Sequence, residues 1–418
     1  MVDILVWLVE RLSHIFARMQ DDNIRQKLAT LARQHRLNVT GGKIRRTSSR
    51  FCFGVEHGDY NGTELFGVGT DRFIWLAYRP NDSGRIRLFS DNFPGDGVID
   101  FQPGQIPPPC SAGNADTWAR FVYGVDFILR RASLPVTRGF DAVLHGNIPG
   151  GGMSRSASLT LNLILTFLEV NGIPVKDHMQ IIDLAQAVEN DYIGSPCGKL
   201  DQIMIYFAKA GMGTHYNPKT RTISYVPLGK GAIDFRIVSL DTGTVRPGLE
   251  KSTYKVRRAE CDELAKLASL TCLADVCDEQ LYRQITGRFP ALAPRLTYIY
   301  HAQQRFYEML AAWKAGNVEK VGAIFRQDGI GLRDDYQISG PELETMCDIA
   351  RSVSGVLGER MLGGGDKGAA GAIVRADAVA ELRNAVQFGY PRSHPAYATK
   401  FAVHVCGLVD GITLLPGF

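Results

Sequence analysis

Apolar residues recur at intervals of three and four positions along two segments of the chain. The first segment covers residues 118–129 and the second covers residues 296–313. This spacing places the apolar side chains on one face of an α-helix. Gly316 follows the second segment, where a helix is expected to stop. The pattern predicts two helices whose apolar faces belong to a hydrophobic core.

Runs of β-branched and aromatic residues between turn-forming residues predict strands elsewhere. Such runs are DRFIWLAY at 71–78 and FDAVLH at 140–145. Others lie within residues 222–240 and near the carboxyl end, in AAGAIVRA and KFAVHVCG. The pattern between them, up to about residue 358, is mainly helical. Residues 79–115 carry many Gly, Pro and Asp, and we expect this segment to be rich in loops.

Strands and helices occur in both halves of the chain, which predicts an α+β (mixed α/β) fold. A chain of 418 residues accommodates about two domains. We place the boundary near residues 215–235, which gives a first domain at 40–220 and a second at 221–418. Residues 1–39 form an N-terminal extension.

The extension begins with MVDILVWLVERLSHIFARM, which predicts an amphipathic helix. Asp3 precedes an apolar stretch that Glu10 and Arg11 end. The stretch is too short to span a bilayer, and its charge order is wrong for a signal peptide. The pattern leaves open whether the apolar face packs on the body of the protein, on a second subunit or on a membrane surface.

Composition narrows the class of protein. Apolar residues make up 45% of the chain and charged residues 22%, which is close to the averages of soluble globular proteins. The net charge of +4 is weak and no block of Lys and Arg occurs, so a nucleic-acid partner is not indicated. The eight cysteines lack paired short spacings. We therefore expect reduced thiols in a cytoplasmic protein that needs no membrane.

The stretch EHGDYNG, residues 56–62, places Glu56, His57 and Asp59 beside a chain reversal. Asp, Asn and Gly are residues that hydrated turns select. A site for a polyol uses the same side chains, because carboxylates accept hydrogen bonds from hydroxyl groups and His donates or accepts them. Taken alone, the stretch favours the turn and leaves the polyol site open.

A second stretch, HGNIPGGGMSRSASLTL at residues 145–161, sets three glycines and several hydroxyl residues before an apolar run. Glycines let the backbone approach a ligand closely, and the free N–H groups of a helix N-terminus bind phosphate. A Gly-rich turn with a Ser N-cap has the same ingredients and no ligand. No Lys follows the glycines, so the stretch is not the P-loop, and it also lacks the dinucleotide-binding spacing.

Two further stretches carry chemistry-bearing or Gly-rich patterns. ENDYIGSPCGKLDQ, residues 189–202, holds Glu189 and Asp201. An acid at a helix start is commonly a dipole partner or cap, whereas a buried carboxylate near phosphates can take a proton from a substrate hydroxyl. RMLGGGDKGAAGAIV, residues 360–374, is again Gly-rich and leads into an apolar segment.

The order and spacing of these stretches resemble the galactokinases of the GHMP small-molecule kinase family. SRFCFGVEHGDYNG is similar to the galactokinase signature GRVNLIGEHTDYNGG, with Arg50 placed before Glu56 as the signature requires. GGGMSRSASL resembles the phosphate loop GxGLSSSAAL of the family, ENDYIGSPCGKLDQ resembles its EhxxxGxxCGxMDQ motif, and RMLGGGDKG resembles its RMTGGGFGG motif. The resemblance extends over about residues 40–415.

The resemblance implies a two-domain GHMP kinase fold with its active site in the cleft between the domains. It implies ATP-dependent phosphorylation of the anomeric hydroxyl of galactose, with Asp201 accepting the proton and Arg50 steadying that carboxylate and offsetting phosphoryl charge. Substrate contacts fall on Glu56, His57, Asp59 and Tyr254. ATP phosphate contacts fall on Gly150, Gly151, Gly152, Ser154, Arg155 and Ser156, and Mg²⁺ ligands on Ser156 and Glu189. The implied partners are a sugar and ATP, in a monomer or a homodimer.

This chain departs from the family pattern in two loops. The phosphate loop is one residue shorter, and Arg155 replaces the middle Ser, where it either clamps a phosphate or points outward. Asp366 and Lys367 stand where Phe and Gly are usual. We expect Lys367 to compensate the repulsion between Asp366 and a phosphate, or the loop to be redirected.

Two other functions fit the same motifs. One is an anomeric kinase for a related sugar such as galacturonate, although Glu56 would face a substrate carboxylate with like charge. The other is a non-catalytic, galactokinase-like regulator that binds sugar and ATP, suggested by the altered phosphate loop. The presence of both Arg50 and Asp201 favours catalysis.

Overall fold

Two β-sheets organise the protein. The computed structural model describes residues 21–111, 116–245, 252–415 and 417–418. In this part of the chain the larger sheet has the order β12-β1-β2-β5-β3-β4, with β6 paired to β2 and β7 paired to β6. The smaller sheet has the order β11-β8-β10-β9. Its neighbouring strands are all antiparallel, and in the larger sheet β3 and β5 are parallel.

The strands of the larger sheet are β1 (Lys43–Gly54), β2 (Leu65–Pro80), β3 (Ile86–Ser90), β4 (Val98–Phe101), β5 (Phe140–Gly146), β6 (Met212–Asn217), β7 (Thr222–Pro227) and β12 (Ile412–Leu415). Those of the smaller sheet are β8 (Phe235–Asp241), β9 (Val356–Met361), β10 (Ala369–Arg375) and β11 (Ala402–Cys406). The α-helices are α2 (Ala119–Arg131), α3 (Arg155–Val170), α4 (His178–Ala187), α5 (Leu200–Tyr206), α6 (Thr253–Leu267), α7 (Glu279–Arg288), α8 (Ala293–Ala315), α9 (Val318–Asp334), α10 (Pro341–Arg351) and α11 (Val379–Ser393), with a further helix at residues 21–34.

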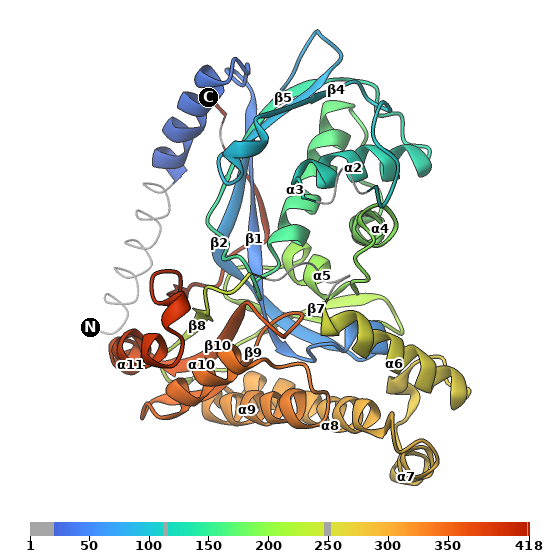
Figure 1. Cartoon of the computed structure of the whole chain (residues 1–418), viewed down its shortest axis with the longest axis vertical. Helices are drawn as coiled ribbons and strands as arrows, with labels where there is room; N and C mark the ends of the chain where they lie inside the picture. Colours follow the sequence, from blue (N-terminus) through green and yellow to red (C-terminus); the bar gives the residue numbers. More distant parts are fainter. Residues whose placement is uncertain (1–20, 112–115, 246–251, 416) are drawn as a thin grey trace.

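Strand β2 shows how the larger sheet acquires a layer on each face. Its side chains alternate between the two faces, as in any strand. Ile74 and Leu76 join the core beneath α2, α3, α4 and α5, whereas Phe73 and Trp75 face the helix at residues 21–34. These helices accordingly lie on opposite sides of the sheet (Figure 1).

The helix at residues 21–34 packs against the body of the protein. Leu28 and Ala32 are buried against the larger sheet, and Asp21 pairs with Arg46 and accepts a hydrogen bond from Trp75 Nε1 at 3.0 Å. The amphipathic segment at residues 1–19 lies outside the described residues.

The smaller sheet is also covered on both faces. Val238 and Leu240 of β8 pack with α10 and α11, whereas Ile237 belongs to a core built mainly by α8 and α9. Phe51 and Phe53 of β1 enter that second core as well. Strand β1 therefore joins the two halves of the molecule, and Arg50 sits at the junction.

The mixed α/β fold is confirmed, and so are the predicted strands at 71–78 and 140–145 and the helices now seen as α2 and α8. The loop-rich segment 79–115 contains two short strands, β3 and β4, that were not predicted. Because β3 takes its partners from β5, five residues suffice to form a strand among Gly, Pro and Asp.

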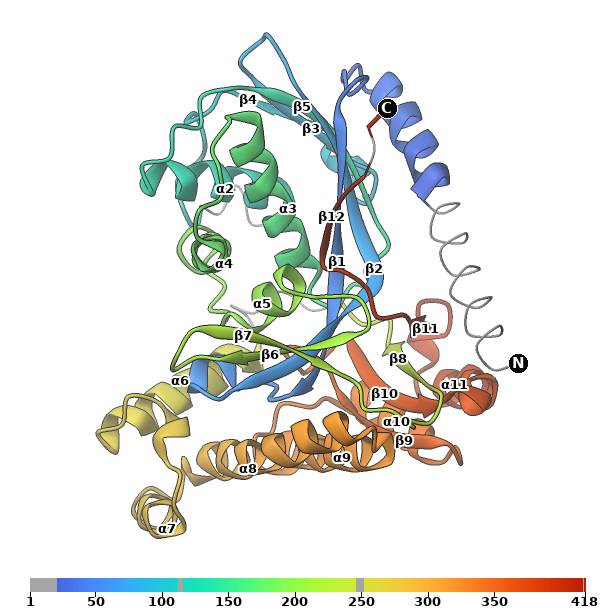
Figure 2. The ribbon, with the colours of Figure 1, turned by 180° about the vertical axis from the view of Figure 1, so that it is seen from behind.

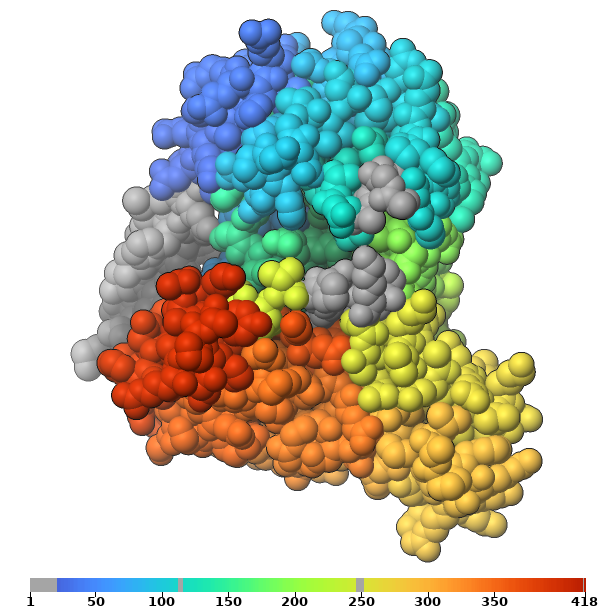
Figure 3. Space-filling view, viewed as in Figure 1, coloured from blue at the N-terminus to red at the C-terminus, as the bar shows by residue number. Residues whose placement is uncertain are grey.

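The domain boundary at residues 220–221 stays a prediction. The two sheets divide between β7 and β8, and β12 returns from the carboxyl end to pair with β1 (Figure 2). Among the described residues, no helix is long and apolar enough to cross a membrane. A hollow separates the two halves on the face shown in Figure 3, with parts of residues 145–205 at its floor.

Candidate active site

A cavity of about 350 Å³ lies between the two halves of the molecule. All the site residues predicted from sequence line it: Arg50, Glu56, His57, Asp59, Gly150, Gly151, Gly152, Ser154, Arg155, Ser156, Glu189, Asp201 and Tyr254. The structure thus brings together motifs that are up to about 200 positions apart in the chain. The roles assigned to these residues stay predictions.

Arg50 and Asp201 form an ion pair in this cavity. Arg50 Nε donates to Asp201 Oδ1 at 2.8 Å, and Nη2 lies 2.7 Å from the same oxygen. The Arg50 side chain is 1% exposed, whereas that of Asp201, in the first turn of α5, is 35% exposed. Burial lowers the pKa of Arg50, but the carboxylates of Asp201 and Glu56 outweigh it and raise the pKa above its ordinary value. Arg50 is therefore a permanent cation that leaves Asp201 accessible to a ligand.

Glu56 is held between two guanidinium groups. Its Oε1 accepts from Arg50 Nη2 at 3.3 Å, and its Oε2 accepts from Arg360 Nη2 at 3.2 Å. Burial raises the pKa of the Glu56 carboxyl, and the two guanidinium groups oppose that shift. The charge of Glu56 is thus compensated, and its effect on a substrate carboxylate stays a prediction. Sequence reasoning missed Arg360, although it begins the RMLGGGDKG stretch.

The loop at residues 56–62, EHGDYNG, is hydrogen-bonded to the helix that carries Asp201. Asp59 Oδ2 accepts from the backbone N–H of Leu200 at 2.9 Å, at the start of α5. A Cβ atom at Gly198 would lie 1.9 Å from that oxygen, so only glycine leaves room for it. Burial raises the pKa of the Asp59 carboxyl, and the Leu200 hydrogen bond opposes the shift.

Aromatic rings surround His57 in the same loop. Its Nδ1 is hydrogen-bonded to Tyr60 Oη at 2.9 Å, and its ring lies 5.2 Å from that of Tyr254 between centroids. Tyr60 in turn contacts Tyr336 Oη at 2.7 Å. His57 adopts a φ of 60°. EHGDYNG is thus a tightly packed wall of the cavity, as well as a chain reversal.

The phosphate loop rests on the second Gly-rich loop. A Cβ atom at Gly151 would lie 2.5 Å from Gly368 Cα, so the two backbones are in close contact. Ser154 precedes α3 with a φ of 63° and makes no side-chain cap hydrogen bond. Its Oγ is buried, and no described residue satisfies it. The turn with a Ser N-cap is therefore the weaker of the two readings, and an unmet hydroxyl beside a helix N-terminus suits an anion.

Arg155 and Asp366, which depart from the family motifs, lie differently with respect to the cavity: Arg155 lines it and Asp366 does not. Arg155 lines the cavity with its guanidinium 5.4 Å from the centre of the Phe93 ring. Burial lowers the pKa of Arg155, and Asp241 of β8 opposes the shift. Asp366 Oδ2 instead accepts from the backbone N–H of Thr253 at 2.8 Å, at the start of α6, and Asp366 and Lys367 are not among the lining residues. The second loop therefore turns Asp366 away from the phosphate loop.

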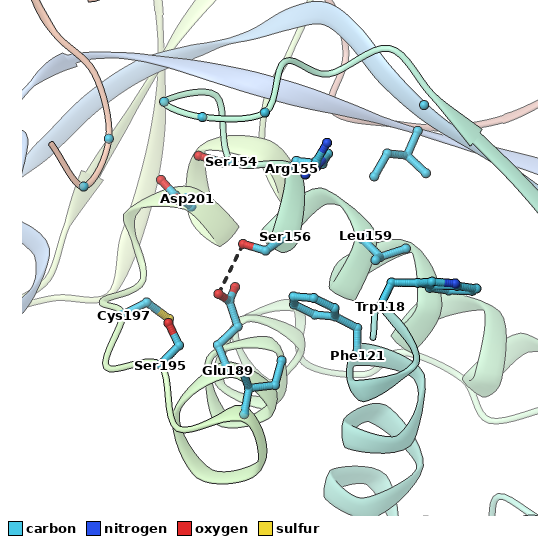
Figure 4. Close-up of a pocket in the computed structure, with 18 of the residues that line it drawn as sticks. Trp118, Phe121, Ser154, Arg155, Ser156, Leu159, Glu189, Ser195, Cys197 and Asp201 are labelled. Carbon is cyan, nitrogen blue, oxygen red and sulfur yellow. Dashed lines mark hydrogen bonds between the residues drawn. The ribbon is translucent and has the colours of Figure 1, made fainter. Parts of the chain in front are cut away.

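Ser156 and Glu189 face each other across the cavity (Figure 4). Ser156 Oγ donates to Glu189 Oε2 at 3.2 Å. Glu189 lies in a π-helical turn at Val188–Ile193, and such turns are frequent at functional sites. Burial, with a smaller contribution from Asp201, raises the pKa of Glu189 to about 7.

The donor set of Ser156 and Glu189 fits a magnesium ion. Within the described ranges, no group of three or more His, Cys, Asp or Glu residues is arranged to hold a metal. Mg²⁺ needs only one or two protein oxygens when it is bound together with nucleotide phosphates. A hydroxyl and a carboxylate at hydrogen-bonding distance meet that requirement.

One end of the cavity is apolar. Trp118, Phe121 and Leu159 lie side by side there (Figure 4), and Ile74 and Leu144 add to this wall. The sequence pattern assigned Trp118 and Phe121 to a core face. Trp118 is buried in the core and Phe121 packs against it, so the core face is confirmed, and both rings also line the cavity.

Comparisons with known proteins identify the family of the chain. Residues 120–209 match the family model of the GHMP kinases N terminal domain. The chain is 31% identical over 348 residues to a galactokinase of Exiguobacterium sibiricum, covering 81% of this chain and 87% of that protein. It is 32% identical over 356 residues to a galactokinase of Chloroflexus aurantiacus, covering 83% and 88%.

Solved structures give the same result. The crystal structure of Lactococcus lactis galactokinase complexed with galactose superposes with a TM-score of 0.83 at 28% identity, covering 90% of this chain and 96% of that chain. The Methanococcus jannaschii mevalonate kinase shares the fold, with a TM-score of 0.62 at 14% identity over 88% of this chain and 98% of its own. From the cavity, its charged residues and these matches together, we conclude that the chain belongs to the GHMP kinase family and is a galactokinase-like phosphotransferase.

Proposed function

We propose that the protein transfers the γ-phosphoryl group of ATP to the anomeric hydroxyl of galactose, giving galactose 1-phosphate and ADP. The observation that carries the proposal is the Arg50–Asp201 pair, which presents a partly exposed carboxylate and a buried cation in one cavity. The galactokinase relatives, one of them solved with galactose, support the choice of sugar.

In the proposed reaction the anomeric oxygen bonds to the γ-phosphorus while the bond from that phosphorus to the β–γ bridging oxygen breaks. Asp201 accepts the proton that the sugar hydroxyl loses. Arg50 keeps that carboxylate in place and stabilises negative charge on the transferring group. ADP leaves, and the proton passes from Asp201 to solvent.

The sugar is assigned to the wall formed by Glu56, His57, Asp59 and Tyr254. A carboxylate has about four acceptor positions, so Glu56 retains capacity for a hydroxyl after its two guanidinium bonds. A hydroxyl partner left unsatisfied in a dry site costs about 1–3 kcal/mol. Such a wall rejects an epimer roughly tenfold to a hundredfold.

ATP is assigned to the loop at Gly150–Gly152, to Ser154, Arg155 and Ser156, and to the apolar end for its base. Backbone N–H groups at the start of α3 and the Arg155 guanidinium supply the positive field for phosphate. Ser156 and Glu189 would hold Mg²⁺, which neutralises phosphate charge when bound. All eight cysteines are free thiols, which supports a cytoplasmic location.

A coupled assay for ADP release over a panel of sugars tests the proposal. We expect turnover with galactose and none with Asp201→Asn, while both forms bind the sugar in calorimetry. Turnover with galacturonate alone would identify galacturonate as the substrate in place of galactose. Galacturonate is included in the panel because the charge of Glu56 is compensated by two arginines. Binding of sugar and ATP with no turnover by the wild type would instead identify a regulator.

A further inference from the structure

Arg360 of β9 is a buried arginine outside the cavity that reaches the catalytic ion pair through one carboxylate. It is 1% exposed and is not among the residues that line the cavity. Its Nη2 donates to Glu56 Oε2 at 3.2 Å and to the carbonyl oxygen of Cys52 at 2.8 Å. Its guanidinium also lies 4.5 Å from the centre of the Phe325 ring.

Arg50 is shared between two carboxylates. Its Nη2 lies 2.7 Å from Asp201 Oδ1 and 3.3 Å from Glu56 Oε1. The shorter contact is with Asp201. The carboxylates of Glu56 and Asp201 therefore compete for the Arg50 guanidinium. The guanidinium of Arg360 contacts Glu56 and does not contact Asp201.

The hydrogen-bonding capacity of Arg360 is only partly used. Its Nε and Nη1 are buried, and neither finds a partner among the described residues. Buried donors without partners are unfavourable, and each calls for an explanation. An apolar residue could fill the space above Phe325 without that penalty, so packing alone does not account for an arginine here.

We propose that Arg360 is a positioning residue that neutralises Glu56 and thereby keeps the Arg50 guanidinium on Asp201. The inference rests on the proposed function, in which Arg50 and Asp201 are the catalytic pair. Without Arg360, the full charge of Glu56 acts on Arg50 alone and draws its Nη2 away from Asp201. The consequence is a defect in turnover that depends on the Glu56 charge.

A double-mutant cycle tests this dependence, because it isolates the interaction between two neighbouring residues. Arg360→Met should lower kcat at least tenfold at saturating sugar and ATP. In the Glu56→Gln background, which has no charge to compete for Arg50, the same substitution should change kcat less than twofold. Equal losses in both backgrounds would overturn the proposal.

The pH profile gives an independent readout. Glu56 faces the cations Arg50 and Arg360, the carboxylates Asp201 and Asp59, and the Cys52 thiol, and Tyr298 Oη donates to its backbone oxygen. Loss of Arg360 removes one of the two groups that hold the pKa of Glu56 down. Glu56 then protonates at a higher pH and releases Arg50. The ratio of kcat in Arg360→Met to wild type should therefore rise as pH falls from 8 to 6, and a flat ratio contradicts the inference.

Two further variants separate positioning from folding. Arg360→Lys keeps the charge and should retain kcat to within about threefold of wild type, because charge compensation matters more here than a bidentate fork. Arg295→Met removes another buried arginine, one that pairs with Glu260 outside the cavity. It should lower the melting temperature and leave kcat within twofold.

If Arg360→Met does not fold, a double variant still tests the role of Arg360. The Glu56→Gln/Arg360→Met double variant leaves no Glu56 carboxylate without its partner, and its kcat must then lie within twofold of that of Glu56→Gln; a larger loss refutes the proposal. The outcome for Asp201→Asn is read separately. If Asp201→Asn keeps full turnover, the proposed function fails. If it is inactive and the cycle is additive, only the role of Arg360 fails.

Discussion

The two ends of the cavity are built in different ways. The end assigned to the sugar consists of compensated charges: Arg50 pairs with both Glu56 and Asp201, and Arg360 pairs with Glu56, in a largely buried network. The end assigned to phosphate consists of backbone in close contact, where Gly151 meets Gly368. Each member of the charged network depends on its partners, whereas the backbone loop leaves its side chains free to vary. This explains how Arg155 and Asp366 depart from the family pattern while the charged residues of the signature stay in place.

The largest effect is expected at the sugar end. Arg50→Met should reduce kcat on the order of 10³-fold, because the transferring phosphoryl group loses its cation. It also leaves two buried carboxylates with less compensation, so the free energy of unfolding should fall by about 3–5 kcal/mol. Steady-state kinetics and denaturant titration measure the two effects.

Arg45→Met is the matched control on the same strand. Arg45 is buried and pairs with Glu169, but it does not line the cavity. It should lose stability without a comparable loss of kcat. Equal kinetic losses in Arg45→Met and Arg50→Met would show that the defect comes from β1 as a whole.

The second largest effect is expected from disrupting the backbone contact between Gly151 and Gly368. Gly151→Ala introduces a Cβ atom 2.5 Å from Gly368 Cα, so the two loops must separate. We expect the KM for ATP to rise about tenfold to a hundredfold because misplaced binding groups lose their contacts, with galactose binding unchanged by calorimetry. Gly150→Ala, whose Cβ would meet nothing within 4 Å, should give a much smaller change. Similar effects of the two substitutions would argue against the close packing of these loops.

A pH-dependent effect is expected at the proposed Mg²⁺ site, Ser156 and Glu189. The pKa of Glu189 is about 7, so the carboxyl is mostly protonated at pH 6 and ionised at pH 8. Metal ligands must be deprotonated, so Mg²⁺-dependent nucleotide binding should strengthen about tenfold over that range. Magnesium titrations at several pH values measure this change. Glu189→Gln should abolish the pH dependence, and a variant that keeps it would remove Glu189 from the proposed metal site.

The smallest effect is expected for Arg155→Ser, which restores the residue usual in the family. Arg155 lines the cavity with its guanidinium over Phe93. A charge-assisted contact to phosphate that is partly exposed to solvent contributes modestly, so the KM for ATP should rise about threefold, with kcat unchanged. An unchanged KM would assign Arg155 to packing against Phe93 alone.

Sequence motifs were enough to assign Arg50, Glu189 and Asp201 to one site, because each residue stands in a motif whose order along the chain could be recognised. The partners of those residues were not accessible in the same way. Arg360 meets Glu56 only because β9 and β1 approach each other in space, and no local spacing encodes that contact. The compensation of Glu56 by two arginines follows from the fold.

The fold shows the same limit. The run of β-branched and aromatic residues in β2 and the helical period of α2 could be seen in the sequence, because β2 is buried along most of its length and α2 buries one face. Strand β3 was missed because its partner β5 lies about 50 residues further on, and β4, which pairs with β3, was missed with it. The apolar face of Trp118 and Phe121 was detected as a core face, and the structure adds that both rings also line the cavity.

The pairing of β12 with β1 has a consequence for synthesis of the chain. Ile412–Leu415 completes the edge of the strand that carries Arg50, through pairs such as Ile44 with Leu415. Residues 412–415 are synthesised long after residues 43–54, so β1 exposes an unpaired edge until they emerge from the ribosome. Exposed edges favour association with other strands. A chain that stops before residue 412 therefore leaves β1 open to aggregation, even though every residue of the cavity has been made.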